Sequence, residues 1–291
     1  MKRISACYSD VYFAATPTAS MRKLPLVARA IESRGLAELV NPGSIDPAKL
    51  MSLHDPEYVN SFLSGSGRLA STQGWGWTSA IRDGVLAINA GQIVGARLAL
   101  DQGVAANVAQ GFHHATFGRG NGYCTFCGLA LVAQEFKDLR IGVLDCDQHE
   151  GNGTAEYTQR LPNLYNFTIY GTSFGATQSE RSIHRPLKSC KDNFRPYMDA
   201  VHEGLNQMKV WKVDIIQYQA GADPHADDPY GTLGLSADQL RERDRTVFQF
   251  AKDHSIPILF DLAGGYQEPL ETKLVPLHVA TFEEAADVFG S

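Results

Sequence analysis

The sequence predicts an α/β protein with a single open, mostly parallel β-sheet and helices on both faces. Short apolar segments alternate along the chain with longer segments whose apolar residues recur at helical spacing. Polar side chains cluster directly after the short segments, as they do at the carboxyl edge of a parallel sheet. The 291 residues, 44% of them hydrophobic, suffice for one large core, and no linker interrupts them. We therefore expect one domain over residues 1–291.

The first half of the chain contains a loop, a helix, a strand and a second helix. Residues 64–79 are rich in glycine and serine and predict a loop, whose Trp75 and Trp77 are either packed onto the body or exposed for binding. Helical spacing of apolar residues predicts a helix at 81–100. The short apolar run VAANVAQ at 104–110 predicts a buried strand, and residues 126–137 predict the next helix.

The second half repeats this alternation. Apolar runs bounded by polar residues predict strands at 140–145, 165–170, 213–219 and 257–262, and amphipathic spacing predicts helices at 195–210, 237–254 and 282–289. Strands separated by helices in this way favour parallel pairing, because each parallel neighbour requires a crossover connection.

Composition excludes several classes of function. A net charge of −6 and a pI of about 5.8 argue against a direct nucleic-acid partner. No run of 18 apolar residues predicts a membrane span, and the N-terminal residues lack the apolar core of a secretory signal. Five cysteines, an odd number, fit reduced thiols in the cytoplasm better than a disulfide framework. The oligomeric state is left open.

Reactive side chains follow four of the predicted strands. These side chains are His113 and His114 after the strand at 104–110, Asp145, Asp147 and His149 at 140–145, Asp223 after 213–219 and Tyr266 after 257–262. Because the carboxyl ends of parallel strands share one edge of a sheet, we expect these groups to meet there.

The stretch DCDQH at 145–149 predicts a metal site. In an extended segment, residues two apart point to the same side, so Asp147 and His149 can bind one ion. Asp223, from a neighbouring strand, completes three ligands, and three protein ligands with an open fourth position are typical of catalytic zinc. Two carboxylates nearly neutralise the ion, so a separate general base is needed to activate water.

The remaining groups at this edge predict a hydrolase of amides or esters. His113 and His114 are the candidate bases, and Asp145 is placed to accept the Nδ1–H of one of them. Tyr266, on a glycine-flanked turn, can donate its hydroxyl to a developing oxyanion. A metal, a base, an orienting carboxylate and an oxyanion donor together fit metal-assisted hydrolysis of a carbonyl compound.

These motifs resemble the histone deacetylase superfamily, which has the arginase-deacetylase fold. The matching blocks lie in order along most of the chain: HDPEYVNSFL (54–63), GFHHATFGRGNGYCTF (111–126), DCDQHEGNGTA (145–155), GADPHADDPYGTLGLS (221–236) and AGGYQ (263–267). The Met-Arg-Lys run at 21–23 and the segment GNGTA at 151–155 are most similar to the class IV (deacetylase-11-like) branch and its bacterial relatives.

The resemblance implies an amidohydrolase that removes acetyl or longer fatty-acyl groups from the lysine side-chain amine of proteins. Asp147, His149 and Asp223 would bind zinc, with ferrous iron as the alternative. His114 would be the general base, Asp145 would orient His113, and Tyr266 would polarise the scissile carbonyl. Asn152 stands where some family members place an aspartate behind the second histidine, and an amide cannot raise the pKa of that histidine by charge.

The resemblance also implies a substrate channel and a second ion. Gly122, Tyr123, Phe174 and Gly265 would line the acyl-lysine channel. A structural potassium ion would be bound in part by the backbone of Asp145, Asp147 and His149, with Thr168 and Ile169 as further candidates. The sequence departs from the family pattern after the histidine pair, where it reads GYCTFCG: Tyr123 adds a hydroxyl to the channel, and Cys127 replaces the usual amide.

Other interpretations differ in how well the residues support them. A deacetylase of small N-acyl amines, such as acetylpolyamines, would use the same catalytic set and stays open. An arginase-like two-metal hydrolase would need a bridging carboxylate at Gly151. A non-catalytic acyl-lysine-binding protein would be expected to lack a ligand or the oxyanion donor. Cys124 and Cys127 have no second pair for a metal site, and plain packing is expected for them.

Overall fold

The computed structural model describes residues 3–290 and confirms the predicted fold class. Within these residues the chain forms one eight-stranded sheet in the order β2-β1-β3-β8-β7-β4-β5-β6, in which every pairing is parallel. The strands are β1 (Ile4–Cys7), β2 (Ala37–Val40), β3 (Val104–Asn107), β4 (Ile141–Asp145), β5 (Leu164–Tyr170), β6 (Ser182–Pro186), β7 (Ile215–Gln219) and β8 (Ile258–Asp261).

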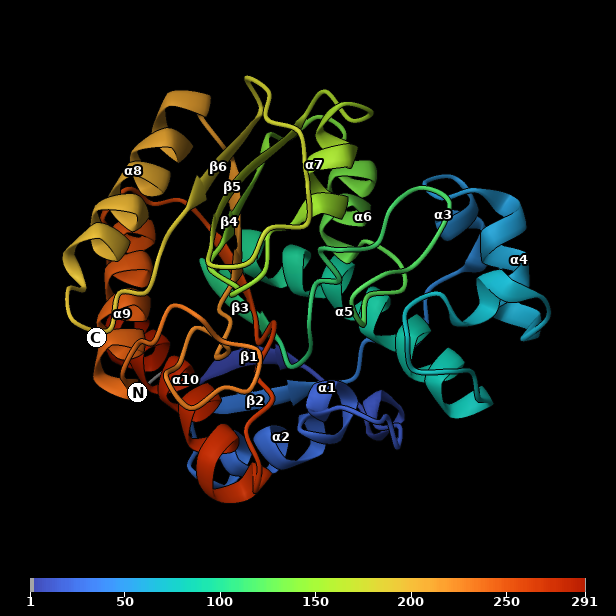
Figure 1. Ribbon diagram of the computed structural model, residues 1–291, viewed down its shortest axis with the longest axis horizontal. Coiled ribbons are helices and arrows are strands. Elements are labelled where there is room, and N and C mark those ends of the chain that lie inside the picture. The colour runs from blue at the N-terminus through green and yellow to red at the C-terminus, as the bar shows by residue number, and fades with distance from the viewer. Residues whose placement is uncertain (1–2, 291) are drawn as a thin grey trace.

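Helices cover both faces of the sheet, as a parallel sheet with apolar faces requires. In Figure 1, α8 and α9 lie to the left of the strands, and α6 and α7 lie to the right. The helices are α1 (Ala19–Arg22), α2 (Leu24–Ser33), α3 (Pro47–Met51), α4 (Pro56–Ser64), α5 (Ser79–Gln102), α6 (Gly128–Glu135), α7 (Asn152–Thr158), α8 (Arg195–Trp211), α9 (Ala237–Asp253) and α10 (Val275–Phe289).

The ten elements expected from residue 81 onward are all present, with shifted ends. The strand expected at 104–110 ends at Asn107, because the backbone then turns, with Ala109 N–H donating to Asn107 O, toward the histidine pair. The helix expected at 282–289 is the end of α10, which begins at Val275. Pro276 lies in the first turn of α10, where the missing N–H costs no helical hydrogen bond.

Eight elements were missed by the sequence analysis: strands β1, β2 and β6, and helices α1 to α4 and α7. The missed strands are only four or five residues long, and β2 and β6 are the two edge strands, where polar residues are tolerated. The expected loop at 64–79 also contains a short 3₁₀ turn at Arg68–Ser71. Both tryptophans of this loop pack onto the body: Trp75 is buried, and Trp77 Nε1 donates to Phe62 O at 2.6 Å.

The topology brings the four reactive strand ends together. Strands β3, β8, β7 and β4 are consecutive in the sheet, so the loops that follow them leave from adjacent positions. The final residues of these four strands are paired with one another in the sheet. They are Asn107, Asp261, Gln219 and Asp145, which are all polar and buried. Gln219 Nε2 donates to Asp261 Oδ2 at 2.8 Å, which links two of these strands beneath the site.

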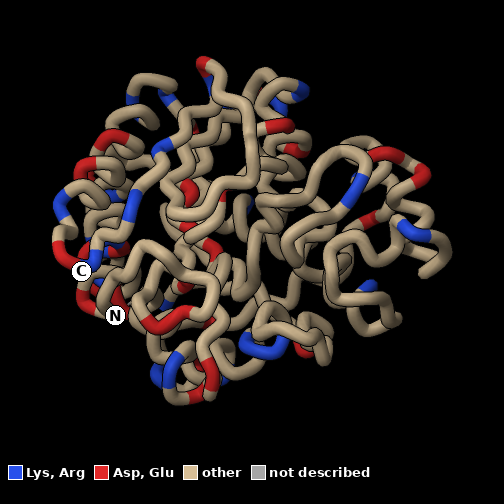
Figure 2. The backbone as a smooth tube through the Cα atoms, in the orientation of Figure 1, with Lys and Arg blue, Asp and Glu red and all other residues tan. Residues whose placement is uncertain are grey.

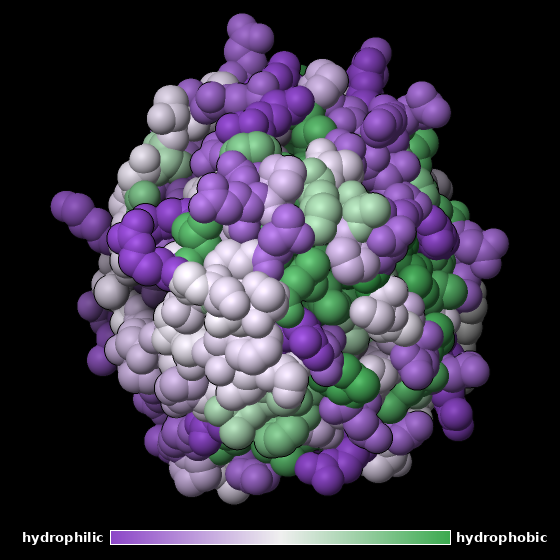
Figure 3. Space-filling model, turned by 90° about the vertical axis from the view of Figure 1, so that its right-hand side faces the viewer, coloured by the Kyte–Doolittle hydropathy of each residue, from purple (hydrophilic) through white to green (hydrophobic). Residues whose placement is uncertain are grey.

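Charged residues of both signs are interspersed along the chain (Figure 2). On the face that carries α3 and α4, hydrophobic residues lie in small groups among polar ones (Figure 3). Among residues 3–290, no helix combines the length and the apolar character that crossing a membrane would require.

Candidate active site

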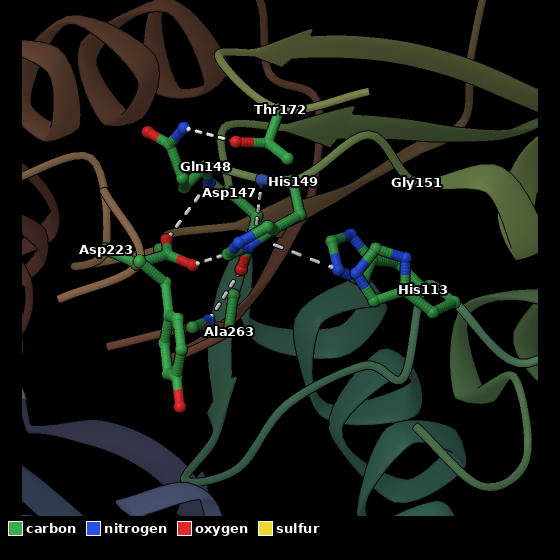
Figure 4. Close-up of polar contacts among 12 residues, drawn as sticks. His113, Asp147, Gln148, His149, Gly151, Thr172, Asp223 and Ala263 are labelled. Carbon is green, nitrogen blue, oxygen red and sulfur yellow. Dashed lines mark hydrogen bonds and ion pairs between the residues drawn. The ribbon is translucent and has the colours of Figure 1, made fainter. Parts of the chain in front are cut away.

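Three metal-competent side chains converge where β4 and β7 end. The candidate ligand atoms of Asp147, His149 and Asp223 all lie within 4.8 Å of one another. His149 Nδ1 is 3.1 Å from an oxygen of each carboxylate, and Figure 4 shows the three side chains directed toward one point. Both carboxylates are buried, so they are held away from bulk water. The spacing in DCDQH and the strand end at Asp223 thus meet as the sequence predicts.

Backbone N–H groups hold the two carboxylates in place. Gly264 N–H donates to Asp147 Oδ2 at 2.7 Å, and Gln148 N–H donates to Asp223 Oδ1 at 3.0 Å. A Cβ atom at position 264 would overlap the carboxylate oxygens of both Asp147 and Asp223. Only glycine therefore lets the loop after β8 approach this closely.

The electrostatics of this cluster favour a cation. Burial and the neighbouring charge of Asp147 raise the pKa of Asp223 to about 6, because two carboxylates are crowded into a site with little water. Burial alone would lower the pKa of His149, but the two carboxylates outweigh it and raise that pKa to about 11. A divalent ion among one nitrogen and two carboxylate ligands would relieve the repulsion, so the donor set fits such an ion.

The two adjacent histidines have different partners and different proton affinities. His113 Nδ1 lies 2.8 Å from Asp145 Oδ2, whereas His114 Nδ1 lies 2.7 Å from Asn152 Oδ1. Burial opposes the charged form of His113, but the carboxylates of Asp145 and Asp147 outweigh it and raise its pKa to about 9. Burial, together with the charge on His113, lowers the pKa of His114 well below its ordinary value. The pair thus combines one charged and one neutral imidazole near pH 7.

A cavity of about 210 Å³ leads to this cluster. It is lined by His114, Gly122, Tyr123, His149, Phe174, Tyr230 and Tyr266. Three of the four residues expected to line the channel are in its wall. Gly265 is not among them: its φ is +139°, and the place of its missing side chain faces Leu274, Ala222 and His278. Tyr230 lines the cavity beside Tyr266, with ring centroids 5.0 Å apart, and was not identified from the sequence.

Further buried charges support the loops around the site, and none was identified from the sequence. Asp228 accepts the N–H groups of Tyr266 at 2.8 Å and Tyr230 at 3.0 Å, so one carboxylate holds two aromatic residues of the cavity. Lys23 Nζ donates to Ala263 O at 2.7 Å. Burial lowers the pKa of Lys23 to about 8, against the raising effect of Asp223 and Asp147. Both residues lie in blocks that carry the family resemblance, but their roles were not assigned from the sequence, because their partners Ala263 and Tyr266 are distant in the chain.

Arg243 ties together the two loops that carry the candidate metal ligands. Its guanidinium is 1% exposed and donates to Gly221 O at 2.8 Å and to Cys146 O at 3.4 Å, while Nε pairs with Asp244 at 2.8 Å. Cys146 precedes Asp147, and Gly221 lies two residues before Asp223. The buried charge therefore links both ligand loops to α9.

Replacing Arg243 by leucine is expected to lower the free energy of unfolding by about 3–5 kcal/mol, because Asp244 would keep its buried charge without the cation that offsets it. Denaturant unfolding of the two proteins measures this. The matched control is Arg195→Leu, whose side chain is 85% exposed and should change the stability by less than about 0.5 kcal/mol. Equal effects of the two substitutions would contradict this role for Arg243.

The cysteines and the other histidines have structural environments. All five cysteines are buried and unpaired within the described residues. Burial raises the pKa of Cys127 to about 12, and its N–H donates to His54 Nε2 at 3.1 Å. His54 Nδ1 also lies 2.8 Å from the hydroxyl of Tyr157. These contacts fit the packing interpretation of Cys124 and Cys127.

Comparisons with known proteins identify the family to which the chain is similar. The model of the histone deacetylase domain matches residues 17–282. An uncharacterised protein of Picosynechococcus is 29% identical over 259 residues, which cover 87% of this chain and 86% of that protein. Histone deacetylase 2 of Arabidopsis thaliana is 31% identical over 61% of this chain, and acetylpolyamine amidohydrolase 2 of Pseudomonas aeruginosa is 24% identical over 53% of it. The matched regions span about half, 48%, of each of these two proteins.

Solved structures agree on the fold. The HDA15 HD domain superposes with a TM-score of 0.81, and 99% of this chain and 90% of that one are covered. An acetylpolyamine aminohydrolase from Burkholderia pseudomallei gives a TM-score of 0.78 with 99% of both chains covered. Both are 16% identical in sequence, so they establish the arginase-deacetylase fold alone. Because the domain model matches most of the chain and the fold agrees with it, this protein belongs to the histone deacetylase family.

Proposed function

We propose that the protein is a metal-dependent deacylase that hydrolyses the amide between an acyl group and the side-chain amine of lysine in proteins. The observation that carries this proposal is that the three ligand groups and the histidine pair gather at the end of a cavity whose wall includes His114, His149 and Tyr266. The cavity wall is largely aromatic, which suits the methylene chain of an acylated amine. Membership of the histone deacetylase family supports the reaction class.

The proposed metal is one zinc ion held by Asp147, His149 and Asp223, with ferrous iron as the alternative. When bound, the ion supplies Lewis-acid polarisation of the amide carbonyl and of the attacking water. A structural potassium ion near the backbone of Asp145 is part of the same proposal, by resemblance to the family. Five unpaired, buried cysteines support a reducing compartment such as the cytoplasm.

The chain's own residues divide the proton transfers between them. His114 directs Nδ1 to Asn152, which leaves Nε2 for the cavity, and its neutral form can accept the proton of the attacking water. His113, kept positive by Asp145, stabilises the negative charge that develops and can protonate the leaving amine. Burial and the carboxylates of Asp223 and Asp147 raise the pKa of Tyr266 well above its ordinary value, so its hydroxyl stays protonated as a donor to the carbonyl oxygen.

A small N-acyl amine is the second candidate substrate. The catalytic groups would act on it in the same way, and acetylpolyamine amidohydrolases are among the relatives of this chain. Turnover of lysine peptides bearing acyl chains of two to sixteen carbons, measured beside acetylated polyamines at matched concentrations, separates the two. A higher kcat/KM for the peptides supports the proposal, whereas a higher value for the polyamines replaces it with the second candidate. Failure to cleave either class would contradict both.

Tyr266→Phe is expected to lower kcat by at least about 10²-fold while leaving the metal content and the fold unchanged. Removing one donor to a developing oxyanion typically has an effect of this size. Steady-state kinetics with elemental analysis of the same preparation measures it. Tyr165→Phe, a partly buried tyrosine on β5 that contacts Trp211, serves as the control and should turn over normally. Near-normal turnover by Tyr266→Phe would show that the carbonyl is polarised without this hydroxyl.

Asn152→Asp is expected to move the acidic limb of the pH–rate profile to higher pH. The reaction requires neutral His114, so the rate rises as the pH passes the pKa of that histidine. A carboxylate 2.7 Å from Nδ1 would stabilise the imidazolium and raise this pKa, so a higher pH would be needed to reach the neutral form. Comparison of kcat/KM profiles between pH 5 and 9 tests this. An unmoved limb would contradict the assignment of His114 as the base.

A further inference from the structure

A buried glutamate with no role in the proposed reaction follows the metal-ligand candidate His149. Glu150 is 2% exposed and does not line the cavity. Its Oε2 accepts from Ser173 Oγ at 2.8 Å, from Phe174 N–H at 2.8 Å and from Ala176 N–H at 3.2 Å. Its Oε1 lies 2.7 Å from His184 Nδ1. One carboxylate therefore connects the segment 173–176 to strand β6.

The β6 end of this connection is rigidly held. His184 is 1% exposed, and its Nε2 lies 2.9 Å from Ser182 Oγ, which accepts from Asn166 Nδ2 on β5 at 3.1 Å. With His184 Nδ1 donating to Glu150 and Nε2 accepting from the Ser182 hydroxyl, these hydrogen bonds form a continuous chain from Glu150 to β5. Glu150 is thus anchored through two strands of the sheet.

The segment that Glu150 holds has few other attachments. Thr172 pairs with His149 before it, and Ser179 pairs with Ser182 after it. The hydrogen bonds of residues 173–178 that do not involve Glu150 are local: Gly175 N–H donates to Ser173 Oγ at 3.2 Å, and the Ser173 side chain also bonds the side chain of Tyr170. Most of these residues are exposed. Glu150 therefore supplies most of the hydrogen bonds that hold this segment.

This segment carries one wall of the cavity. The Phe174 ring stacks on His114, the proposed base, with centroids 4.0 Å apart and an interplanar angle of 21°. The same ring meets His149 edge-on, with centroids 5.8 Å apart and an angle of 90°. A shift of the segment would move an aromatic surface away from both the base and the channel.

We propose that Glu150 is the positioning residue that fixes the Phe174 wall of the channel and thereby sets the affinity for the alkyl arm of the acylated amine. This inference rests on the proposed deacylase function. Contacts between Phe174 and an alkyl chain would exist both before and during the reaction, because this part of the substrate does not react. Loss of such contacts raises KM and leaves kcat nearly unchanged.

Kinetics of Glu150→Ala on an acetyl-lysine fluorogenic peptide tests this role. We expect KM to rise about 10-fold, with kcat within about 3-fold of the parent and an unchanged metal content. The same substitution in a Phe174→Ala background should change KM by less than about 2-fold, since the wall it positions is already gone. An equal rise of KM in both backgrounds, or a loss confined to kcat, would overturn the proposal. Glu135→Ala, which removes a carboxylate paired with Lys49 and Arg97, is the matched control.

Hydrogen exchange gives a readout that needs neither substrate nor metal. The N–H groups of Phe174 and Ala176 donate to Glu150, so exchange across 172–178 should be at least about 10-fold faster in Glu150→Ala. Exchange in β7, residues 215–219, should be unchanged, which separates a local effect from global loosening. Unchanged exchange at 172–178 would overturn the proposal. If Glu150→Ala does not fold, Glu150→Gln, which keeps the volume but not the charge, should show both effects at about 3-fold.

These measurements separate this inference from the proposed function. If the wild-type protein hydrolyses no acylated amine, the proposed function fails, whereas faster exchange in the Glu150 variant would still show that this carboxylate holds the Phe174 segment. If the wild-type protein is a deacylase and exchange is unaffected, the proposed function stands and the role of Glu150 is wrong.

Discussion

Replacing Asp223 by alanine is expected to remove most of the bound divalent metal and to lower kcat/KM by at least about 10³-fold. Asp223 is fully buried, with Oδ2 3.1 Å from His149 Nδ1, so its loss removes one of the three ligand groups and one of the two carboxylates at the site. Loss of the ion would remove several kcal/mol of charge stabilisation in the transition state, and each 1.4 kcal/mol corresponds to about tenfold in rate. Elemental analysis should find about one equivalent in the wild-type protein and far less in the variant.

The same loop provides a matched control for this experiment. Asp227 is exposed and lies four residues after Asp223, so Asp227→Ala should keep both the metal and the turnover. Cys124→Ser and Cys127→Ser should also keep the metal. Two equivalents of metal in the wild-type protein would contradict the single site, and full retention of metal by Asp223→Ala would show that the ion is bound by other residues.

His114→Ala is expected to abolish measurable turnover, a loss of about 10³- to 10⁴-fold in kcat, while His113→Ala retains more activity. A positioned general base contributes about 10²- to 10⁴-fold. His114 is the histidine of the pair that lines the cavity, and Asn152 leaves it neutral, whereas Asp145 keeps His113 protonated and unable to accept a proton. Steady-state kinetics of both variants, with metal content measured on the same samples, gives the comparison.

Replacement of an exposed histidine is the control for any effect that loss of an imidazole has outside the site. His202 lies on the surface of α8, and His202→Ala should turn over normally. A larger loss in His113→Ala than in His114→Ala would exchange the roles of the two residues. The deacylase proposal would survive that result, because both histidines lie within reach of the same cluster.

The local sequence was sufficient to predict the elements and site residues that depend on neighbouring positions in the chain. Long apolar and amphipathic segments such as α5, α8 and α9 were expected because helical periodicity is visible within one window. Asp147 and His149 were expected to share a site because residues two apart in an extended segment face the same side. The edge strands β2 and β6 were not expected, since four or five partly exposed residues show no clear period.

The order of the strands in the sheet determines which reactive strand ends are neighbours, and the local sequence pattern does not give this order. The sequence alone determined that four strands end in reactive residues, and only the order β3-β8-β7-β4 makes those ends neighbours. Tyr230, Asp228, Arg243 and Glu150 acquire their roles through contacts with residues that are far away in the chain or that lie in irregular loops. Such contacts leave no periodic pattern in the sequence, because hydrogen bonds and ring packing between loops depend on which segments the folded core brings together. The reacting groups could therefore be predicted from the sequence, while the residues that hold them in position could be identified only from the tertiary structure.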